Sequence, residues 1–323
     1  MNRPYLSYNR EKRTGLTDLF VRLAEKRTAL LRQRPIPKNR ELRDRLAEVR
    51  IVPPETVLQH ITCAGVPCQW ITSPRSADTT GVILYIHGGS WIYGSLRTAR
   101  AFGILLEEYT GCKVLVVDYR LLPEHPYPAG LDDCFSVYQW LLASGYQPGH
   151  IGLFGDSAGG NLSLCLLNRL KSLGYPYPAC AGIASPVTDL RPDSPFATSD
   201  ADLLYVPYPP GQEQTILDLY AHNQSKSHPF LSPICGDLSG LPPILIHCGS
   251  EEPLVEDNIA YGGAAYAQGV DIQVVVYEGL FHDFTVTGRA LHESLHSIAA
   301  FAAFFEGWMA RTRPAPAGTL HQG

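Results

Sequence analysis

The pentapeptide Gly155-Asp156-Ser157-Ala158-Gly159 lies between two apolar runs and restricts the possible folds of the chain more than any other segment. Residues 151–154 can form a short buried strand, and residues 161–167 can carry a helix. A serine in so sharp a strand-to-helix turn is held clear of its own backbone, as in a nucleophile elbow. The flanking glycines suit the turn, because a Cβ there would clash with neighbouring backbone. The pentapeptide also occurs by chance, so other segments have to support this interpretation.

A glycine pair follows an earlier apolar run. Residues 82–86 have the length and composition of a buried strand, and His87-Gly88-Gly89-Ser90-Trp91 comes directly after them. Glycines at the end of a buried strand allow backbone N–H groups to point into a cleft, and an oxyanion hole needs such fixed donors. The alternative is an ordinary glycine turn. Beside a serine elbow, the oxyanion hole is the better interpretation.

A histidine and an acidic residue complete the set. Residues 274–277 favour a strand, and the position of His282 in the loop that follows distinguishes it among the 11 histidines. Residues 244–248 favour another strand, and Glu251 and Glu252 come after it. The order Ser157, acid, His282 is the order of nucleophile, acid and base in one class of serine hydrolases. In that class the acid orients the imidazole, and the imidazole takes the proton of the serine.

Several segments together resemble one family. They are residues 87–89 (His-Gly-Gly), 118–129 (Asp-Tyr-Arg-Leu-Leu-Pro-Glu-His-Pro-Tyr-Pro-Ala), 155–161 (Gly-Asp-Ser-Ala-Gly-Gly-Asn), 185–190 (Ser-Pro-Val-Thr-Asp-Leu) and 241–243 (Leu-Pro-Pro). Residues 118–129 are the most diagnostic, since nothing in general hydrolase chemistry requires them. From about residue 81 to residue 284, the chain resembles the hormone-sensitive lipase family of α/β-hydrolases, which includes many bacterial carboxylesterases and the arylacetamide deacetylases.

The resemblance implies a fold and a chemistry. The fold is α/β, with a mainly parallel central sheet flanked by helices and a helical cap, and the alternation of strand-like and helix-like runs agrees with it. The implied triad is Ser157, Glu252 and His282, and the implied oxyanion hole consists of Gly88, Gly89, Ser90 and Ala158. The implied activity is that of a serine carboxylesterase acting on short- to medium-chain acyl or aryl esters. The reaction proceeds through an acyl-enzyme on Ser157 and needs no cofactor or metal.

Three residues depart from the family's pattern. Glu252 stands where the family usually has Asp, and although the triad tolerates either acid, Glu251 and Glu256 are its nearest rivals. Ser90 replaces a glycine but keeps the backbone N–H that the oxyanion hole needs. Asp283 replaces a glycine after His282, and a carboxylate there would raise the pKa of the imidazole if it came within a few ångströms. The alternatives for Asp283 are that it faces solvent or caps the following helix.

Composition and charge narrow the class of protein. A chain of 323 residues with 45% apolar content can bury a large core. A net charge of −5 without a basic-aromatic stripe gives no reason to expect nucleic acid as a partner. No run reaches membrane-spanning length and no signal peptide is visible, so we expect a cytoplasmic protein without a membrane span. The eight cysteines show no C-x-x-C pair, which favours reduced thiols over disulfides or zinc; Cys63 and Cys68 could bridge in an oxidising compartment.

Charge and proline patterns divide the chain into parts. We expect helices of a cap in residues 1–50, the catalytic domain in residues 51–310 with a cap insertion at about 191–232, and a flexible tail in residues 311–323. The N-terminal helix is basic and amphipathic. Docking on the acidic body is favoured over lying on a membrane. The candidate pocket residues are Trp91, Asp156, Phe196, Tyr205, Tyr208 and Phe281.

Other functions remain open at this point. The same site suits an amidase, a deacetylase of a natural product or another acyl-processing enzyme. A different class is a non-catalytic ligand receptor on a hydrolase scaffold, since related hormone receptors carry serine at the position of Ser90. The presence of both Ser157 and His282 argues against the receptor. The expected partner is a small-molecule ester, and a homodimer is a further possibility.

Overall fold

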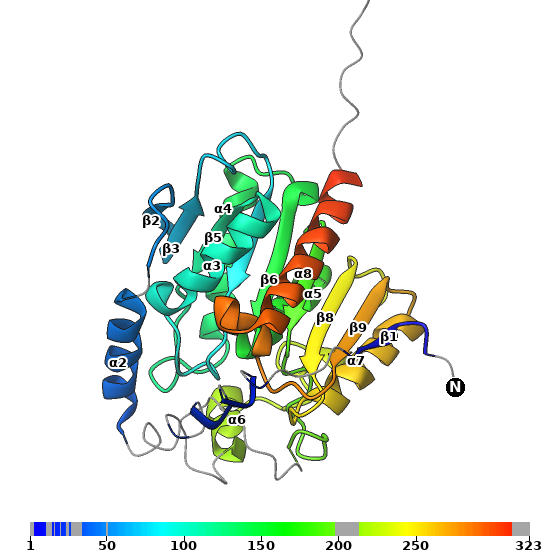
Figure 1. Ribbon diagram of the computed structural model, residues 1–323. Helices are drawn as coiled ribbons and strands as arrows, with labels where there is room; N and C mark the ends of the chain where they lie inside the picture. The colour runs from blue at the N-terminus through cyan, green and yellow to red at the C-terminus, as the bar shows by residue number, and fades with distance from the viewer. Residues whose placement is uncertain are drawn as a thin grey trace, which may run out of the picture.

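A single mixed sheet organises the computed structural model, which describes residues 3–10, 15, 17–19, 21–23, 26, 34–49, 51–197 and 213–311 (Figure 1). In this described part the sheet has nine strands in the order β1-β9-β8-β7-β6-β4-β5-β3-β2. Their bounds are β1 Leu6–Asn9, β2 Val57–Cys63, β3 Val66–Thr72, β4 Val82–Ile86, β5 Lys113–Val117, β6 Ile151–Asp156, β7 Cys180–Ala184, β8 Ile244–Gly249 and β9 Ile272–Tyr277.

The sheet is parallel from β1 to β5, and only β3 pairs antiparallel with β5 and with β2. Every residue of β4, β6, β7 and β8 is buried, which explains why these strands are continuous apolar runs without alternation. The predicted fold, a mainly parallel sheet between helices, is confirmed. Since the carboxyl ends of parallel strands share one edge, the loops after β4, β6, β7, β8 and β9 meet there.

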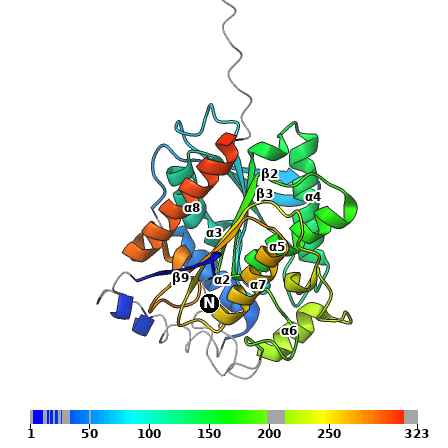
Figure 2. The same cartoon turned by 90° about the vertical axis from the view of Figure 1, so that its right-hand side faces the viewer.

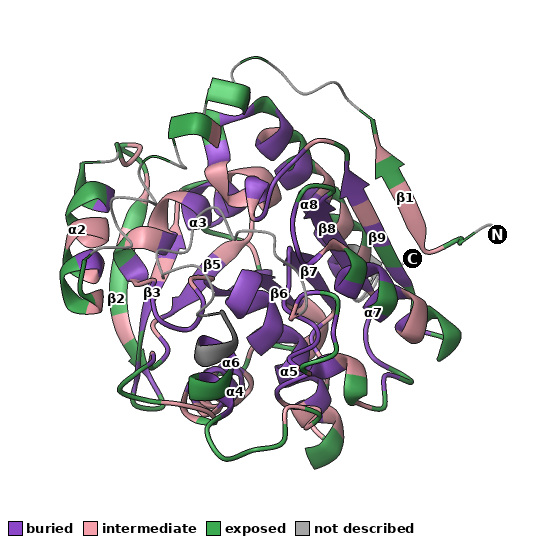
Figure 3. Cartoon of the chain, turned by 90° about the horizontal axis from the view of Figure 1, so that it is seen from below, coloured by how far each residue is buried: buried purple, intermediate pink, exposed green. Residues whose placement is uncertain are grey.

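Helices cover both faces of the sheet (Figure 2). Helices α3 (Leu96–Thr110) and α8 (His292–Arg311) pack on one face, and α4 (Ala129–Ala143), α5 (Ser157–Leu173) and α7 (Val255–Ala267) pack on the other. Helix α2 (Ile36–Glu48) lies beside α3, and α6 (Glu213–Ala221) lies below the sheet in Figure 1. Short 3-10 helices are η1 (Pro148–His150), η2 (Pro233–Cys235) and η3 (Phe284–Ala290). Burial is deepest in the central strands and α5, while α2 and β2 keep exposed faces (Figure 3).

The N-terminal segment is only partly the helical cap that we expected. Leu6–Asn9 form β1, which pairs in parallel with β9 from Leu6 opposite Val274 to Asn9 opposite Tyr277. This strand was not foreseen within residues 1–50, which we had assigned to the helices of a cap. Four residues without an apolar run carry little local signal, so the pairing with β9 decides their conformation. Helix α2 does form, and Arg40 at its centre makes two 3.0 Å hydrogen bonds to Glu124 and holds it on the body.

The structure also bears on the expectations about a membrane span, the cysteines and the domain division. No helix in the described part of the chain has both the length and the apolar character needed to span a membrane. None of the eight cysteines forms a disulfide, and this includes the buried Cys63 and Cys68 on the β2–β3 hairpin. The division into a cap, a catalytic domain and a tail stays a prediction, and residues 312–323 of the tail lie outside the described residues.

Candidate active site

Ser157 stands at the junction of β6 and α5, and its backbone is strained. Its φ is +50°, in the left-handed region that side-chain-bearing residues rarely adopt. A Cβ on Gly159 would collide with the carbonyl oxygen of Ile86, so only glycine lets α5 start this close to the end of β4. The predicted nucleophile elbow is present. Its strain holds the Ser157 hydroxyl at the carboxyl edge of the sheet.

His282 connects the nucleophile to the acid. Its Nε2 lies 3.0 Å from Ser157 Oγ, and its Nδ1 lies 3.5 Å from Glu252 Oε2. Both His282 and Glu252 are almost fully buried, so their interaction is only weakly screened by water. Glu251 and Glu256, the two other candidates for the acid of the triad, are exposed, whereas His282 is buried. The geometry therefore supports Glu252 as the third member of the triad.

Ser185 is a residue of the site that sequence reasoning did not assign. It follows β7 with a φ of +45°, and its hydroxyl donates a 2.7 Å hydrogen bond to Glu252 Oε2. The same hydroxyl accepts a 3.2 Å hydrogen bond from the backbone N–H of Asp283. Asn258 Nδ2 adds a 3.4 Å bond to the other oxygen of Glu252. Ser185 thus holds the carboxylate of Glu252 and the loop of His282 in place together. In the sequence, the motif Ser185-Pro186-Val187 after a strand was the one sign of this role.

The loop after β4 faces the elbow. Gly88 N–H donates a 2.9 Å hydrogen bond to Asp156 Oδ2, so this N–H is already used and the oxyanion-donor role predicted for Gly88 is revised to a positioning role. Gly89 and Ser90 have φ values of +123° and +54°, and among the described residues their N–H groups and that of Ala158 have no acceptor. Ala158 is the second residue of α5, where helix N–H groups lack intrahelical partners. These three N–H groups remain the proposed oxyanion hole.

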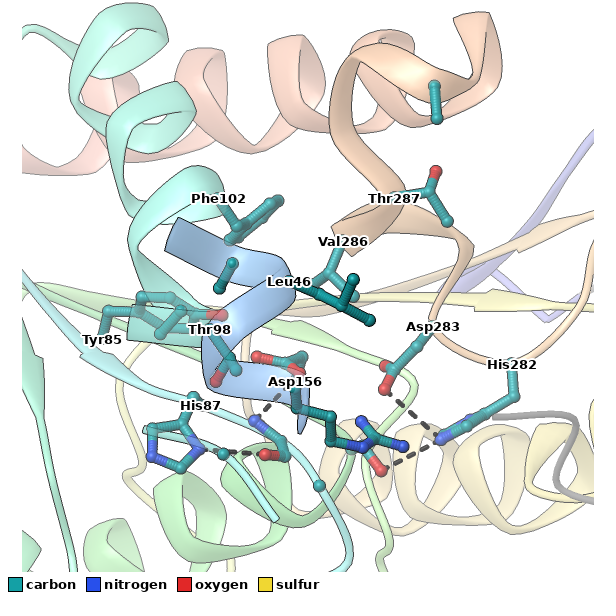
Figure 4. A pocket seen from close by; sticks show the side chains of 18 residues that line it. Leu46, Tyr85, His87, Thr98, Phe102, Asp156, His282, Asp283, Val286 and Thr287 are labelled. Carbon is teal, nitrogen blue, oxygen red and sulfur yellow. Dashed lines mark hydrogen bonds and ion pairs between the residues drawn. The ribbon is translucent and has the colours of Figure 1, made fainter. Parts of the chain in front are cut away.

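A cavity of about 340 Å³ opens onto the nucleophile. Figure 4 shows Asp156, His87 and His282 on one side of it and Phe102, Val286 and Thr287 on the other. Helix α2 contributes Arg43, Leu46 and Ala47 to the lining, and β4 contributes Tyr85. Sequence reasoning missed these walls, because no motif marks them.

The predicted pocket residues divide into two groups. Asp156 lines the cavity as expected. Trp91, Phe196 and Phe281 do not line it: Trp91 stacks on Tyr220 with ring centroids 4.2 Å apart, and all three side chains are buried in the core. Their large apolar surface is removed from water by packing, which the sequence cannot distinguish from a role in a pocket. Tyr205 and Tyr208 lie outside the described residues.

Charge around His282 sets its protonation. Burial alone would lower the pKa of His282, but the carboxylates of Asp283 and Glu252 outweigh it and raise the pKa to about 9. Asp283 Oδ2 lies 3.5 Å from Nε2, and the left-handed backbone of Asp283 (φ +59°) helps to place it there (Figure 4). Burial also raises the pKa of Asp156, to about 6, although hydrogen bonds from Tyr85 and Gly88 oppose the change. In contrast, burial lowers the pKa of His87 to about 4, so His87 is neutral at pH 7.

We expect an alkaline pH–rate profile that depends on Asp283. The base must be neutral to accept the serine proton, so kcat/KM should rise with pH and level off near the pKa of His282, about 9. The Asp283 carboxylate is the largest of the causes that raise the pKa of His282, so in Asp283→Asn this pKa falls and the plateau should begin at a lower pH. Asp271→Asn, on an exposed residue before β9, is the matched control and should leave the profile unchanged. An Asp283→Asn profile that superimposes on the wild type would contradict this role.

The fold and the site together define a serine hydrolase of the α/β-hydrolase class, and comparison with known proteins agrees. A family model described as alpha/beta hydrolase fold matches residues 83–286. The putative acetyl-hydrolase LipR of Mycobacterium tuberculosis is 33% identical over 83% of the chain and 86% of its own length. The acetyl-hydrolase of Streptomyces hygroscopicus is 34% identical over 78% and 83%. The carboxylesterase NlhH of Mycobacterium tuberculosis is 32% identical over 78% and 85%.

Solved structures give the same result. The crystal structure of an esterase from the bacterial hormone-sensitive lipase family superimposes with a TM-score of 0.84 at 32% identity, covering 93% of this chain and 100% of that chain. A mutant of the esterase E40 superimposes with a TM-score of 0.85, also at 32% identity, covering 92% and 100%. The chain therefore belongs to the hormone-sensitive lipase family of α/β-hydrolases and is a carboxylic ester hydrolase.

Proposed function

We propose that the chain is a serine carboxylesterase that hydrolyses short- to medium-chain acyl or aryl esters through an acyl-enzyme on Ser157. The observation that carries the proposal is the 3.0 Å approach of His282 Nε2 to Ser157 Oγ in the wall of the cavity. A cavity of about 340 Å³ lies near the lower end of the range of ligand pockets, which favours small acyl groups.

The mechanism follows from the positions of the groups. His282 accepts the proton of Ser157 while Oγ attacks the ester carbonyl, and Glu252 stabilises the resulting imidazolium. The N–H groups of Gly89, Ser90 and Ala158 stabilise the oxyanion. His282 then gives the proton to the leaving alcohol, which departs and leaves the acyl group on Ser157. His282 then deprotonates a water molecule, which attacks this ester. The resulting tetrahedral intermediate collapses, His282 returns the proton to Ser157 Oγ, and the carboxylic acid is released.

The test is hydrolysis of p-nitrophenyl acetate, butyrate, octanoate and palmitate by the wild type and by Ser157→Ala. We expect serine-dependent turnover with an optimum at the short or medium chains, because the cavity limits the length of the acyl group. Mass spectrometry of protein quenched during turnover should find the added acyl group on the peptide that contains Ser157. An optimum at palmitate would contradict the proposed substrate class. Turnover of matched amides faster than esters would indicate an amidase instead, and no turnover by folded protein would indicate a receptor.

We also propose a cytoplasmic protein that forms a homodimer. Eight cysteines without a disulfide, six of them buried, agree with a reducing compartment. The outermost strand β2 has an exposed face that includes Val57, and an unpaired strand edge can pair with a second copy. Light scattering coupled to size-exclusion chromatography should give twice the mass of the 35.5 kDa chain. A value near 35.5 kDa at micromolar concentration would contradict the dimer.

A further inference from the structure

A second cavity adjoins the active-site cavity. It also measures about 340 Å³, and four residues line both cavities, namely Phe102, Val286, Thr287 and Ala290. The shared residues form the partition between the two spaces, and Figure 4 shows Phe102, Val286 and Thr287 on the side of the active-site cavity away from His87. We call the second space the outer cavity. It lies directly beyond the wall opposite the catalytic groups.

The partition has a fixed part and a less constrained part. Phe102 is only 4% exposed, and its ring centroid lies 5.5 Å from that of Tyr85 and 5.1 Å from that of Phe154. Such packing on two sides holds the ring in place. Val286 and Thr287 are partly exposed and belong to the short helix η3 rather than to the core. A chain leaving the active-site cavity would therefore pass Val286 rather than displace Phe102.

The outer cavity suits an apolar chain. Ile104 and Leu105 in its lining are buried, and Pro53 and Ala101 add apolar surface. Its charged lining residue, Arg289, is exposed and forms an ion pair with Glu108. Among the residues that the structure describes, no carboxylate lines the outer cavity, whereas Asp156 and Asp283 line the active-site cavity. The lining thus changes from polar near Ser157 to apolar beyond Val286.

Exposed apolar side chains belong to both linings and to the short stretch of chain between them. Leu46 in the active-site cavity is 51% exposed, Val49 is 79% exposed, and Ile51 in the outer cavity is 93% exposed. Exposed apolar side chains that line a cavity offer apolar surface to a bound ligand. Here they connect two cavities that share a wall, which argues for one extended ligand rather than for two separate ones.

We propose that the outer cavity binds the far end of an unbranched apolar chain of the substrate, with the chain passing Val286 and the ester at Ser157. This inference rests on the proposed esterase function and names its substrate class: medium-chain esters, up to about the length of an octyl chain, whose far end extends past the active-site cavity. The chain belongs to either the acyl group or the alcohol, since both are hydrocarbon and the partition does not discriminate between them. Each methylene that the outer cavity buries contributes about 0.8 kcal/mol, or about fourfold in kcat/KM.

The experiment closes or opens the outer cavity without touching the catalytic groups. Ala101→Phe fills it from α3, since Ala101 lines the outer cavity but not the active-site cavity. Val286→Ala enlarges the passage. Ala143→Phe, at the exposed end of α4, is the matched control for adding the same side chain to a helix. The substrates are two series: p-nitrophenyl acetate, butyrate, hexanoate and octanoate for the acyl chain, and ethyl, butyl and octyl acetate for the alcohol chain.

The expected readout is a ratio of kcat/KM values. Ala101→Phe should lower the ratio of long-chain to short-chain kcat/KM at least about tenfold in one of the series, corresponding to two or three methylenes without burial. Val286→Ala should raise the same ratio, and Ala143→Phe should not change it. A loss in the acyl series places the acyl chain in the outer cavity, and a loss in the alcohol series places the alcohol there. Ratios for Ala101→Phe and Val286→Ala equal to the wild type in both series would overturn the inference.

Failure of the inference differs from failure of the proposed function. If wild-type protein hydrolyses acetate and butyrate in a serine-dependent way while the ratios stay constant, the esterase function stands and the outer cavity is unused. If the wild type hydrolyses no ester of either series, the proposed function itself fails. Thermal unfolding of each variant identifies misfolded protein. Since Val286 is only partly buried, its truncation should cost less stability than that of a core residue such as Phe102.

Discussion

Ser157→Ala is expected to lower kcat for p-nitrophenyl butyrate by about three to six orders of magnitude, the range seen when a triad nucleophile is removed. The physical reason is that the variant has no oxygen to form the acyl-enzyme, so only direct attack of water on the ester carbonyl, assisted by the remaining groups of the site, is left. The hydroxyl of Ser157 is held 3.0 Å from the base by a strained backbone at the start of α5. Stopped-flow or prolonged steady-state assays at pH 9 can cover this range.

The control for Ser157→Ala lies on the same helix. Ser172→Ala makes the same change at an exposed position near the end of α5, where the hydroxyl donates a 2.9 Å hydrogen bond to the backbone oxygen of Arg169. We expect this variant to keep wild-type kcat. A Ser157→Ala variant within tenfold of the wild type, with the same melting temperature, would mean that another group is the nucleophile.

Glu252→Gln is expected to lower kcat by about three to four orders of magnitude, since the comparable change in a serine protease costs about ten thousandfold. The amide cannot stabilise the imidazolium, and its NH₂ group can face His282 Nδ1, which would favour the wrong tautomer. Here Oε2 of Glu252 is 3.5 Å from Nδ1 and accepts a 2.7 Å bond from Ser185. The effect should therefore appear in kcat more than in KM, measured with p-nitrophenyl butyrate.

Glu256→Gln is the matched control for Glu252→Gln. Glu256 lies on the first turn of α7 and is exposed, so its neutralisation should leave kcat within about twofold. Loss of turnover in Glu256→Gln with normal turnover in Glu252→Gln would reverse the assignment of the acid. Equal intermediate losses in both variants would show that the two carboxylates act together.

The catalytic groups could be predicted from the sequence because each lies in a local pattern of residues. Ser157 stands in a pentapeptide whose glycines are required by the close approach of β4 and α5, and His282 follows a recognisable strand. Glu252 was predicted from its place after β8, although two neighbouring acids competed for the role. The alternation of apolar and helical runs was enough to predict the parallel sheet, since strands covered on both faces must be apolar throughout.

The cavity walls could not be predicted in the same way. Phe102, Val286 and Leu46 come from three segments far apart in the chain, and none belongs to a motif. The aromatic residues Trp91, Phe196 and Phe281 were chosen because aromatic side chains often line pockets, yet they pack in the core. Strand β1 was missed because its sequence carries no apolar run, and only its partner β9 fixes its conformation. Such features depend on long-range packing, which local patterns do not encode.

The N-terminal segment contributes to two distant places, with a practical consequence for protein engineering. Strand β1 extends the sheet beside β9, while α2 lies at the opposite side of the molecule (Figure 1) and supplies Arg43, Leu46 and Ala47 to the active-site cavity. A shortened chain that begins at residue 51 would expose an edge of β9 and remove one wall of the cavity. The N-terminus is therefore not an appendage that can be exchanged between relatives as a module. A chimaera with a relative should therefore take β1 and α2 from the same parent as the strands and helices that they contact.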